Sequence, residues 1–340
     1  MLHFLSSLFT RPAERSGGLD ETLFEKAIER VVSGTDRRLH ALGDYRKRLR
    51  QPVEQAVLHC ISLVDALPAP VLISAQAYGD DHKLRALFAS VEHLREVCGG
   101  MNMLRDYLAD LSGPPPDEIF GLLLASREER NVFGMELDGD TLRRDVLQTA
   151  VNFFNHRYLG SADNELDTRW ELKKRAFDFL IEKALEQLTS EKSKRRELDQ
   201  QRHLLKRKLD AMRAGQWGLG SMLDDAASQP TNLAGLEAEI AAIEAELGKR
   251  HADRLGLEES LAHVADTLSH PEDWLAAREI SLCLDYRGFK IAPSSAAGHE
   301  ITLTELFSGT GERKTIMLGR IVRAELPEPA DFWKTAKRYL

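Results

Sequence analysis

Cysteine is scarce in this chain, with three residues in 340, Cys60, Cys98 and Cys283. Their spacing contains no Cys-x-x-Cys pair, which excludes a zinc knuckle and a disulfide framework and favours a reducing compartment. Long apolar runs are missing as well. No segment approaches the roughly 20 apolar residues that a transmembrane helix requires. We therefore expect a soluble protein of the cytoplasm.

Motifs of the common enzyme classes are also missing. There is no Gly-x-Ser-x-Gly elbow, and no helical histidine pair stands at metal-binding spacing with a carboxylate. Residues 308–315 resemble a phosphate loop, but they lack the four-residue gap before Gly-Lys that this motif requires. A hairpin turn explains the glycines. His59 and Cys60 would diverge on a helix, with Cys60 on the apolar face. We predict no catalytic residue, metal site or cofactor, although an enzyme site of dispersed residues stays open.

Positive charge is not in excess overall. The formal net charge is -8, with 43% hydrophobic and 29% charged residues, which indicates a folded protein that does not coat nucleic acid non-specifically. Basic residues are nevertheless concentrated in one place. Residues 192–213 hold nine Lys or Arg against three acids. A helix this basic could lie along phosphates, or it could present a solvated face.

What the sequence does contain is a pair of heptad ladders joined by a glycine-containing loop. The first consists of Phe177, Ile181, Ala184, Leu188, Glu191, Arg195, Leu198, Arg202, Leu205, Leu209 and Met212. The second consists of Leu233, Leu236, Ile240, Ile243, Leu247, Arg250, Arg254, Leu257, Leu261, Val264 and Leu268. Steps of three and four keep one stripe of a helix against a partner. We predict an antiparallel coiled-coil hairpin over residues 165–270, called the arm below.

Charge favours pairing of the two ladders within one chain. Residues 168–214 hold 14 Lys and Arg against 8 Asp and Glu, whereas residues 232–268 hold 3 against 8. A hairpin sets these opposite charges side by side. If Met212 faces Leu233, then Glu191 faces Arg254, and this polar pair would fix the register at some cost in stability. A four-helix assembly of two chains, and the oligomeric state in general, stay open.

The regions beside the arm show other periodicities. Residues 20–112 are predicted to be helical, with one helix starting at Pro52, and residues 117–164 form a first β segment. Within it, a hairpin is expected around a polar turn at residues 126–130. Thr168 and Glu171 match a capping box that would open the arm.

The segment after the arm, residues 271–340, reads as β-rich. An antiparallel hairpin returns the chain to where it left, so both sets of strands can join one sheet. The predicted fold is α+β: a helical N-terminal region and a mixed or antiparallel sheet, interrupted by the arm.

Function is predicted from the loop at the end of the arm. Exposed Trp and Met are typical binding anchors, so we expect a non-enzymatic interaction or scaffold protein that docks a protein partner. The alternative is that these apolar residues plug the end of the hairpin. In placement alone the acids resemble the acidic tips of coiled-coil factors that enter the RNA polymerase secondary channel, without any matching sequence motif. The tip residues are Trp217, Leu219, Met222, Leu223, Asp224 and Asp225.

Two other partners are considered. The basic arm helix is the candidate for nucleic-acid or ribonucleoprotein binding, through Arg195, Arg196, Lys206, Arg207 and Lys208. Residues 1–19 are read as an amphipathic or flexible segment. Its apolar residues between Leu2 and Phe9 could touch the inner face of a membrane, or dock on the protein itself.

Overall fold

The computed structural model describes residues 21–111, 113–138, 141–213, 233–248, 253–292, 298–309 and 311–326. It contains helices and a largely antiparallel sheet, so the predicted α+β class is confirmed. The chain divides into two compact units. Unit 1 contains the described parts of 57–178 and 271–340, and unit 2 contains those of 19–56 and 179–270. None of the described helices is long and apolar enough to cross a membrane.

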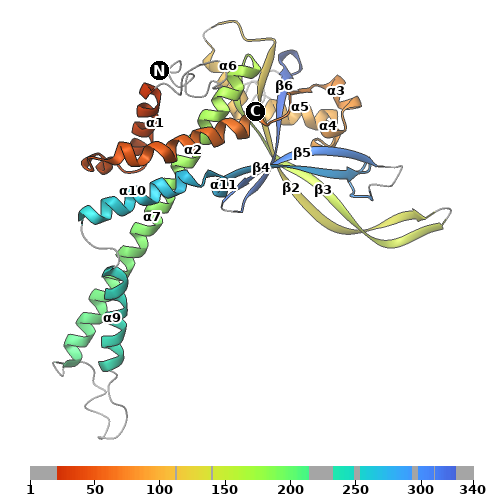
Figure 1. Cartoon of the computed structure of the whole chain (residues 1–340). Helices are drawn as coiled ribbons and strands as arrows, with labels where there is room; N and C mark the ends of the chain where they lie inside the picture. Colours follow the sequence, from red (N-terminus) through yellow and green to blue (C-terminus); the bar gives the residue numbers. More distant parts are fainter. Residues whose placement is uncertain are drawn as a thin grey trace, which may run out of the picture. The chain divides into compact units, whose positions relative to one another are not determined.

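One six-stranded sheet organises unit 1 (Figure 1). The strands are β1 (Val71–Ile73), β2 (Glu118–Asp138), β3 (Thr141–Ala162), β4 (Leu275–Leu284), β5 (His299–Ser308) and β6 (Arg313–Val322). They run in the order β3-β2-β6-β5-β4, and β1 adds a short parallel pairing to β6. The strands on both sides of the long helices therefore share one sheet, as their order along the chain predicted.

The β2–β3 hairpin is longer than predicted. β6 pairs with β2 only up to Ala125, and beyond it β2 and β3 pair with each other as far as Asp138 and Thr141. The turn predicted at residues 126–130 is wrong, because these residues continue β2. Their charges find ionic partners, for example Lys290 Nζ at 2.6 Å from Glu129 Oε2. The Asp-Gly step at residue 138 is a hairpin signal that the prediction overlooked.

Both faces of the sheet are covered by helices of unit 1. One face packs on α3 (Ala75–Asp80), α4 (His82–Leu87), α5 (Val91–Gly100) and α6 (Asn102–Asp110) through a core that includes Phe88, Leu104 and Leu123. On the other face, Val64 at the end of α2 (Tyr45–Asp65) and Leu172 near the start of α7 (Glu165–Arg213) pack on Leu122 and Leu318. Alternating side chains of β2 and β6 thus serve two cores, as expected of a sheet covered on both sides.

Unit 2 is helical. It is built from α1 (Glu21–Gly34), the 3-10 helix η3 (Arg37–Ala41), residues 45–56 of α2, residues 179–213 of α7, α9 (Leu233–Gly248) and α10 (Asp253–Ser269). Its fully buried side chains include Val31, Leu39, Leu49, Leu180 and Leu261. The two remaining short helices, α11 (Pro271–Trp274) and η4 (Arg323–Glu325), belong to unit 1.

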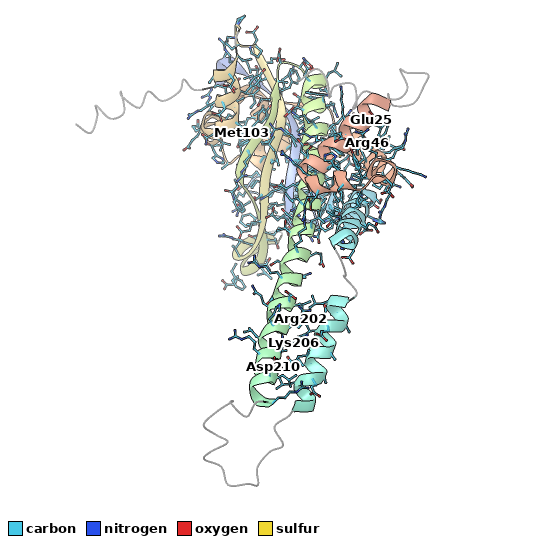
Figure 2. The ribbon with its side chains drawn as sticks, turned by 90° about the vertical axis from the view of Figure 1, so that its left-hand side faces the viewer. Glu25, Arg46, Met103, Arg202, Lys206 and Asp210 are labelled. Atoms are coloured by element: carbon cyan, nitrogen blue, oxygen red, sulfur yellow. The ribbon has the colours of Figure 1, made fainter. Side chains whose placement is uncertain are left out.

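Helix α2 starts earlier than the sequence indicated. Pro52 lies inside it, whereas we predicted that it would open the helix. The first turn is instead held by α1: Tyr45 Oη donates to Glu29 Oε1 at 2.6 Å, and Arg46 pairs with the same carboxylate at 2.9 Å. Figure 2 shows Arg46 beside Glu25, also of α1. These contacts and the burial of Leu49 offset the backbone hydrogen bond that proline cannot make.

The capping box predicted at Thr168 is also wrong. Helix α7 begins at Glu165, and its cap is Asn164, whose Oδ1 accepts from the Asp167 backbone N–H at 2.9 Å. The Asn164 amide donates in return to Asp167 Oδ2 at 2.7 Å. Thr168 is fully buried and its hydroxyl donates to the Asn164 carbonyl. The cap at Asn164 and the capping box at Thr168 both suit a helix start, and the helix begins at the earlier of the two.

The first ladder lies on one continuous helix, α7, as predicted. The second ladder is divided between α9 and α10, and residues 249–252 between them lie outside the described ranges. A single coiled-coil hairpin over residues 165–270 is therefore not confirmed. The apolar stripe of α7 also has another partner, because a Cβ added to Gly34 of α1 would come within 2.6 Å of Ile181 Cγ2.

Asp36 ties η3 to α7 within unit 2. Its Oδ1 accepts from the Arg38 backbone N–H at 3.1 Å, and its Oδ2 accepts from Lys192 Nζ at 2.8 Å. Hydrogen bonds from Arg38 and Lys192 hold the pKa of the Asp36 carboxyl well below its usual range, against the opposing effect of burial. We expect Asp36→Ala to lower the free energy of unfolding by about 2 kcal/mol at neutral pH.

The same contact predicts a pH dependence. A lowered carboxyl pKa in the folded state stabilises the protein above the ordinary Asp pKa of about 3.9, and this stability is lost as pH falls through the folded value. The difference between wild type and Asp36→Ala in urea unfolding should therefore shrink as the pH falls below about 4. Asp210→Ala serves as the control, because Asp210 is an exposed residue of α7. An equal difference at neutral and acid pH would contradict the assignment.

Candidate functional sites

The predicted docking tip cannot be placed. Its six residues, Trp217, Leu219, Met222, Leu223, Asp224 and Asp225, lie outside the described ranges, as does the segment from Leu2 to Phe9. Of the predicted register pair, Glu191 is described and accepts from Lys194 Nζ at 3.1 Å, whereas the Arg254 side chain is not described. These assignments stay predictions.

Helices α7 and α9 lie side by side in both views (Figures 1 and 2). Two ion pairs of 2.5 Å join them, Lys206 with Glu244 and Arg213 with Glu237. Leu209 of α7 and the apolar stripe of α9, which consists of Ile240, Ile243 and Leu247, are buried. Part of the positive charge of the basic helix α7 is thus paired with acidic residues of α9, as the charge count predicted.

The remaining cations of the basic helix differ in their surroundings. Lys192 pairs with Asp36, and Arg202 pairs with Asp199 at 2.6 Å. Arg196, Arg207 and Lys208 are exposed, and no ion pair to them occurs in the part of the chain that the structure describes. The Arg195 side chain is not described. The structure therefore leaves a shorter basic patch than the sequence suggested.

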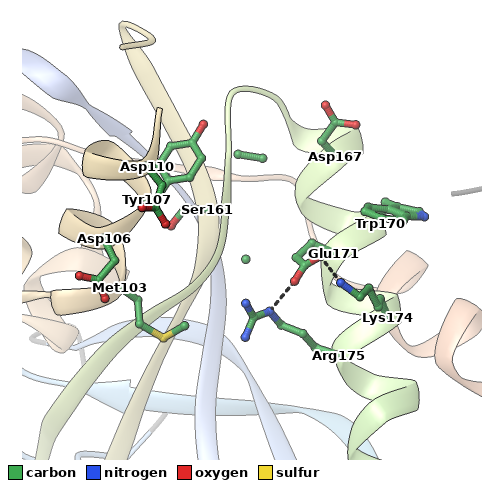
Figure 3. Close-up of a pocket in the computed structure, with 12 residues that line it drawn as sticks. Met103, Asp106, Tyr107, Asp110, Ser161, Asp167, Trp170, Glu171, Lys174 and Arg175 are labelled. Carbon is green, nitrogen blue, oxygen red and sulfur yellow. Dashed lines mark hydrogen bonds and ion pairs between the residues drawn. The ribbon is translucent and has the colours of Figure 1, made fainter. Parts of the chain in front are cut away.

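A pocket lies in unit 1 between α6, the end of β3 and the start of α7 (Figure 3). Its volume is about 690 Å³, within the range of small-molecule and peptide sites. Met103 and Asp106 of α6 face Glu171 and Arg175 of α7 across it. The lining consists of Met103, Asp106, Tyr107, Asp110, Gly160, Ser161, Ala162, Asp167, Trp170, Glu171, Lys174 and Arg175.

Three polar groups of this pocket have defined surroundings. Glu171 is neutralised by Arg175 at 3.0 Å and by Lys174 at 3.5 Å. Burial and the hydrogen bond that Tyr107 donates to Asp163 raise the pKa of Tyr107 to about 12, so its phenol stays protonated at neutral pH. The buried Ser161 hydroxyl has no hydrogen-bond partner among the described residues. No hydrogen bond among the described residues therefore links this hydroxyl to a general base.

Two of the cysteines, Cys60 and Cys98, are buried and unreactive. Burial raises the pKa of Cys98 to about 12 and that of Cys60 well above its usual range, so both thiols stay protonated at neutral pH. Cys60 is fully buried, as predicted, and the neighbouring His59 ring nitrogen Nε2 contacts the Leu275 carbonyl at 2.6 Å. Within the described ranges, no group of three or more His, Cys, Asp or Glu could hold a metal ion.

Sequence reasoning missed both the pocket of Figure 3 and a second pocket that contains His82 and His299. Their side chains come from helices and strands that are far apart in the chain, so no local motif marks them. The one signal in the sequence for these pockets was the presence of polar residues at the ends of helices and strands.

Comparison with known proteins adds no relative: no protein-family model, no curated protein and no solved structure matches this chain.

Proposed function

We propose that the protein is a non-enzymatic interaction or scaffold protein that docks a protein partner through residues 215–229. The observation that supports this most is the α7–α9 pair, whose apolar residues and ion pairs are satisfied by one another. Arg213 ends α7 and Leu233 begins α9, so the connecting segment belongs to the end of this pair. A helix pair that stabilises itself can carry a binding segment without needing the partner to fold.

The composition of the segment indicates the chemistry of the partner. Trp217, Met222 and Leu223 supply apolar anchors, and Asp224 and Asp225 follow them directly. The matching surface is an apolar pocket with basic side chains at its rim. The proposal includes the finer prediction that the arm is an antiparallel coiled coil over residues 165–270. It also includes a cytoplasmic location, with the membrane contact of residues 2–9 as a further part.

The test compares what co-purifies with the full-length chain and with Trp217→Ala. Loss of a large buried anchor typically costs a partner about 2 kcal/mol or more, so affinity should fall at least about 30-fold. Leu204→Ala is the matched control, because Leu204 is an exposed apolar residue of α7 away from the tip, with 66% of its surface accessible. Retention of every partner by Trp217→Ala, with the fold intact, would disprove tip docking.

The second candidate function is nucleic-acid or ribonucleoprotein binding along α7. It is favoured by the exposed patch of Arg196, Arg207 and Lys208, which no described acid neutralises. Binding should weaken steeply with added salt, and the combined change of Arg207 and Lys208 to Gln should reduce the salt slope by about 2. Lys206 is left unchanged in this test, because its loss would also release Glu244 of α9. Salt-independent partner retention favours the docking tip instead.

A further inference from the structure

A second pocket in unit 1 has the composition of an anion site. It lies between α4, the start of α5, the middle of β3 and the ends of β4 and β5. Its volume is about 430 Å³, sufficient for a small metabolite. Buried Val151, Phe153 and Ile301 give it an apolar floor. The polar side chains around this floor determine which ligands the pocket can bind.

Those polar side chains are mainly hydrogen-bond donors. Arg85 of α4 and Arg287 of the turn after β4 both line the pocket, together with the imidazoles of His82, His93 and His299. One carboxylate lines it, Asp285. Its Oδ1 already accepts from the backbone N–H groups of Arg287 and Phe289, at 2.8 and 2.9 Å. The pocket therefore has more positive charge and more donors than its own acceptors use.

Nearby acids do not cancel this excess. Asp81, which precedes His82, caps α4 by accepting from the Lys83 backbone N–H at 2.7 Å. The tight turn at residues 285–288 is closed by Asp285 and by Gly288 at a φ of 83°. Both acids thus have structural roles as hydrogen-bond acceptors. Arg287 Nε also lies 3.8 Å from Asp285 Oδ2, a loose ion pair, whereas no ion pair joins Arg85 to an acid in the described part of the chain. An anionic ligand would therefore meet an unpaired Arg85 and a partly neutralised Arg287.

The ring tautomers follow from the donors beside them. The Ala89 backbone N–H donates to His93 Nδ1 at 3.1 Å, and the Arg85 guanidinium donates to His82 Nδ1. A backbone amide and a guanidinium can only donate, so each neutral ring carries its proton on Nε2. Both rings thereby offer an Nε2–H donor. His299 stacks on His82 with a centroid distance of 3.7 Å and an interplanar angle of 18°.

The stacked histidines are suited to respond to an anion. Burial, with His299 and Arg85 nearby, lowers the pKa of His82, so this ring is neutral at pH 7 without a ligand. A bound anion would oppose these effects and favour the charged ring. Histidine resonances are therefore a direct probe of occupancy.

We propose that this pocket binds a small oxyanion ligand, a compound with a phosphoryl or carboxylate group held by Arg85, Arg287 and His82. The arginines supply charge-assisted hydrogen bonds, and the His82–His299 stack supplies a flat wall beside the anion. Because its elements belong to one unit, the site needs no second copy of the chain.

The test is a titration of the full-length protein followed by the imidazole proton resonances in NMR spectra. Inorganic phosphate, adenosine monophosphate and citrate are added separately in the millimolar range, at constant ionic strength. We expect a saturable shift of the His82 and His299 resonances, assigned with His82→Gln. Affinity should fall about tenfold in Arg85→Gln and in Arg287→Gln, because each removes one charge-assisted contact. Both arginines are exposed, so these variants should fold.

The control is Arg95→Gln, an exposed arginine of α5 that does not line the pocket and should leave the affinity unchanged. Saturable binding of phosphate and adenosine monophosphate identifies a phosphoryl ligand, whereas binding of citrate identifies a carboxylate ligand, and either supports the proposal. The absence of a saturable shift with all three probes overturns it. Equal affinity in wild type, Arg85→Gln and Arg287→Gln also overturns it.

Discussion

Gly121→Ala is expected to destabilise the protein by about 3 kcal/mol, because the added methyl group would overlap a buried ring. Gly121 of β2 pairs with Gly319 of β6, and the Tyr158 ring packs against both glycines. A Cβ at Gly121 would lie 2.7 Å from Cζ of Tyr158, well inside van der Waals contact. Urea or thermal unfolding measures the loss.

The Tyr158 ring has little freedom to move away. It is 1% exposed, and its hydroxyl lies 2.8 Å from the Gly319 carbonyl and 3.0 Å from the Ile119 carbonyl. Burial also raises the pKa of Tyr158, so the hydroxyl remains a donor over the ordinary pH range. The clash must therefore be taken up by the sheet itself, which is the reason for the large expected effect.

A matched glycine provides the control. Gly79 of α3 has no atom within 4 Å of an added Cβ, so Gly79→Ala should be neutral or stabilise by up to about 1 kcal/mol. Combining Gly121→Ala with Tyr158→Leu should recover part of the loss, because the smaller side chain vacates the space. Wild-type stability in Gly121→Ala would show that the ring can move and that this packing argument is wrong.

Arg127→Ala is the second large effect, with an expected loss of about 3–5 kcal/mol. Arg127 of β2 donates from Nε and Nη2 to Glu305 Oε1 of β5, at 2.8 and 2.6 Å. Glu305 is 1% exposed, so removal of the guanidinium leaves a buried carboxylate with insufficient compensation. Arg278 lies 3.6 Å from the other oxygen of Glu305 and cannot replace the two lost hydrogen bonds.

A double-mutant cycle separates the pair from its surroundings. Arg127→Ala combined with Glu305→Gln should be more stable than Arg127→Ala alone, because the uncompensated charge is gone. Arg130→Ala is the control: its partner is Glu128, both side chains are exposed, and the change should stay within about 0.5 kcal/mol. Simple additivity of the Arg127 and Glu305 changes would contradict a coupled buried pair.

The same arginine shows why part of the fold could not be predicted. Residues 126–130 read as a turn, because consecutive charges are unusual in a strand. Arg127 belongs in β2 because Glu305 lies beside it in the folded sheet, and that neighbour is far away in the chain. Pro52 is a similar case: the residues that hold the turns of α2 around it include Glu29 of another helix.

The candidate sites were harder to predict than the fold. The predicted tip rests on a short local segment, so it could be proposed from sequence but not placed. The pocket of Figure 3 and the His82–His299 pocket could not be proposed at all. Each pocket is lined by residues from several helices and strands. These residues do not form a recognisable motif in the sequence.

The sequence by itself determined the α+β class, the ladder on α7 and the union of the β segments in one sheet. These features depend on residue period and chain order. Only the tertiary structure decided the path of β2 through Arg127, the start of α2 and the grouping of His82 with His299. The β2 path, the α2 start and the histidine pair are stabilised by contacts between residues that are distant in the chain. A local sequence pattern does not contain this information. The ladders therefore predicted helices correctly.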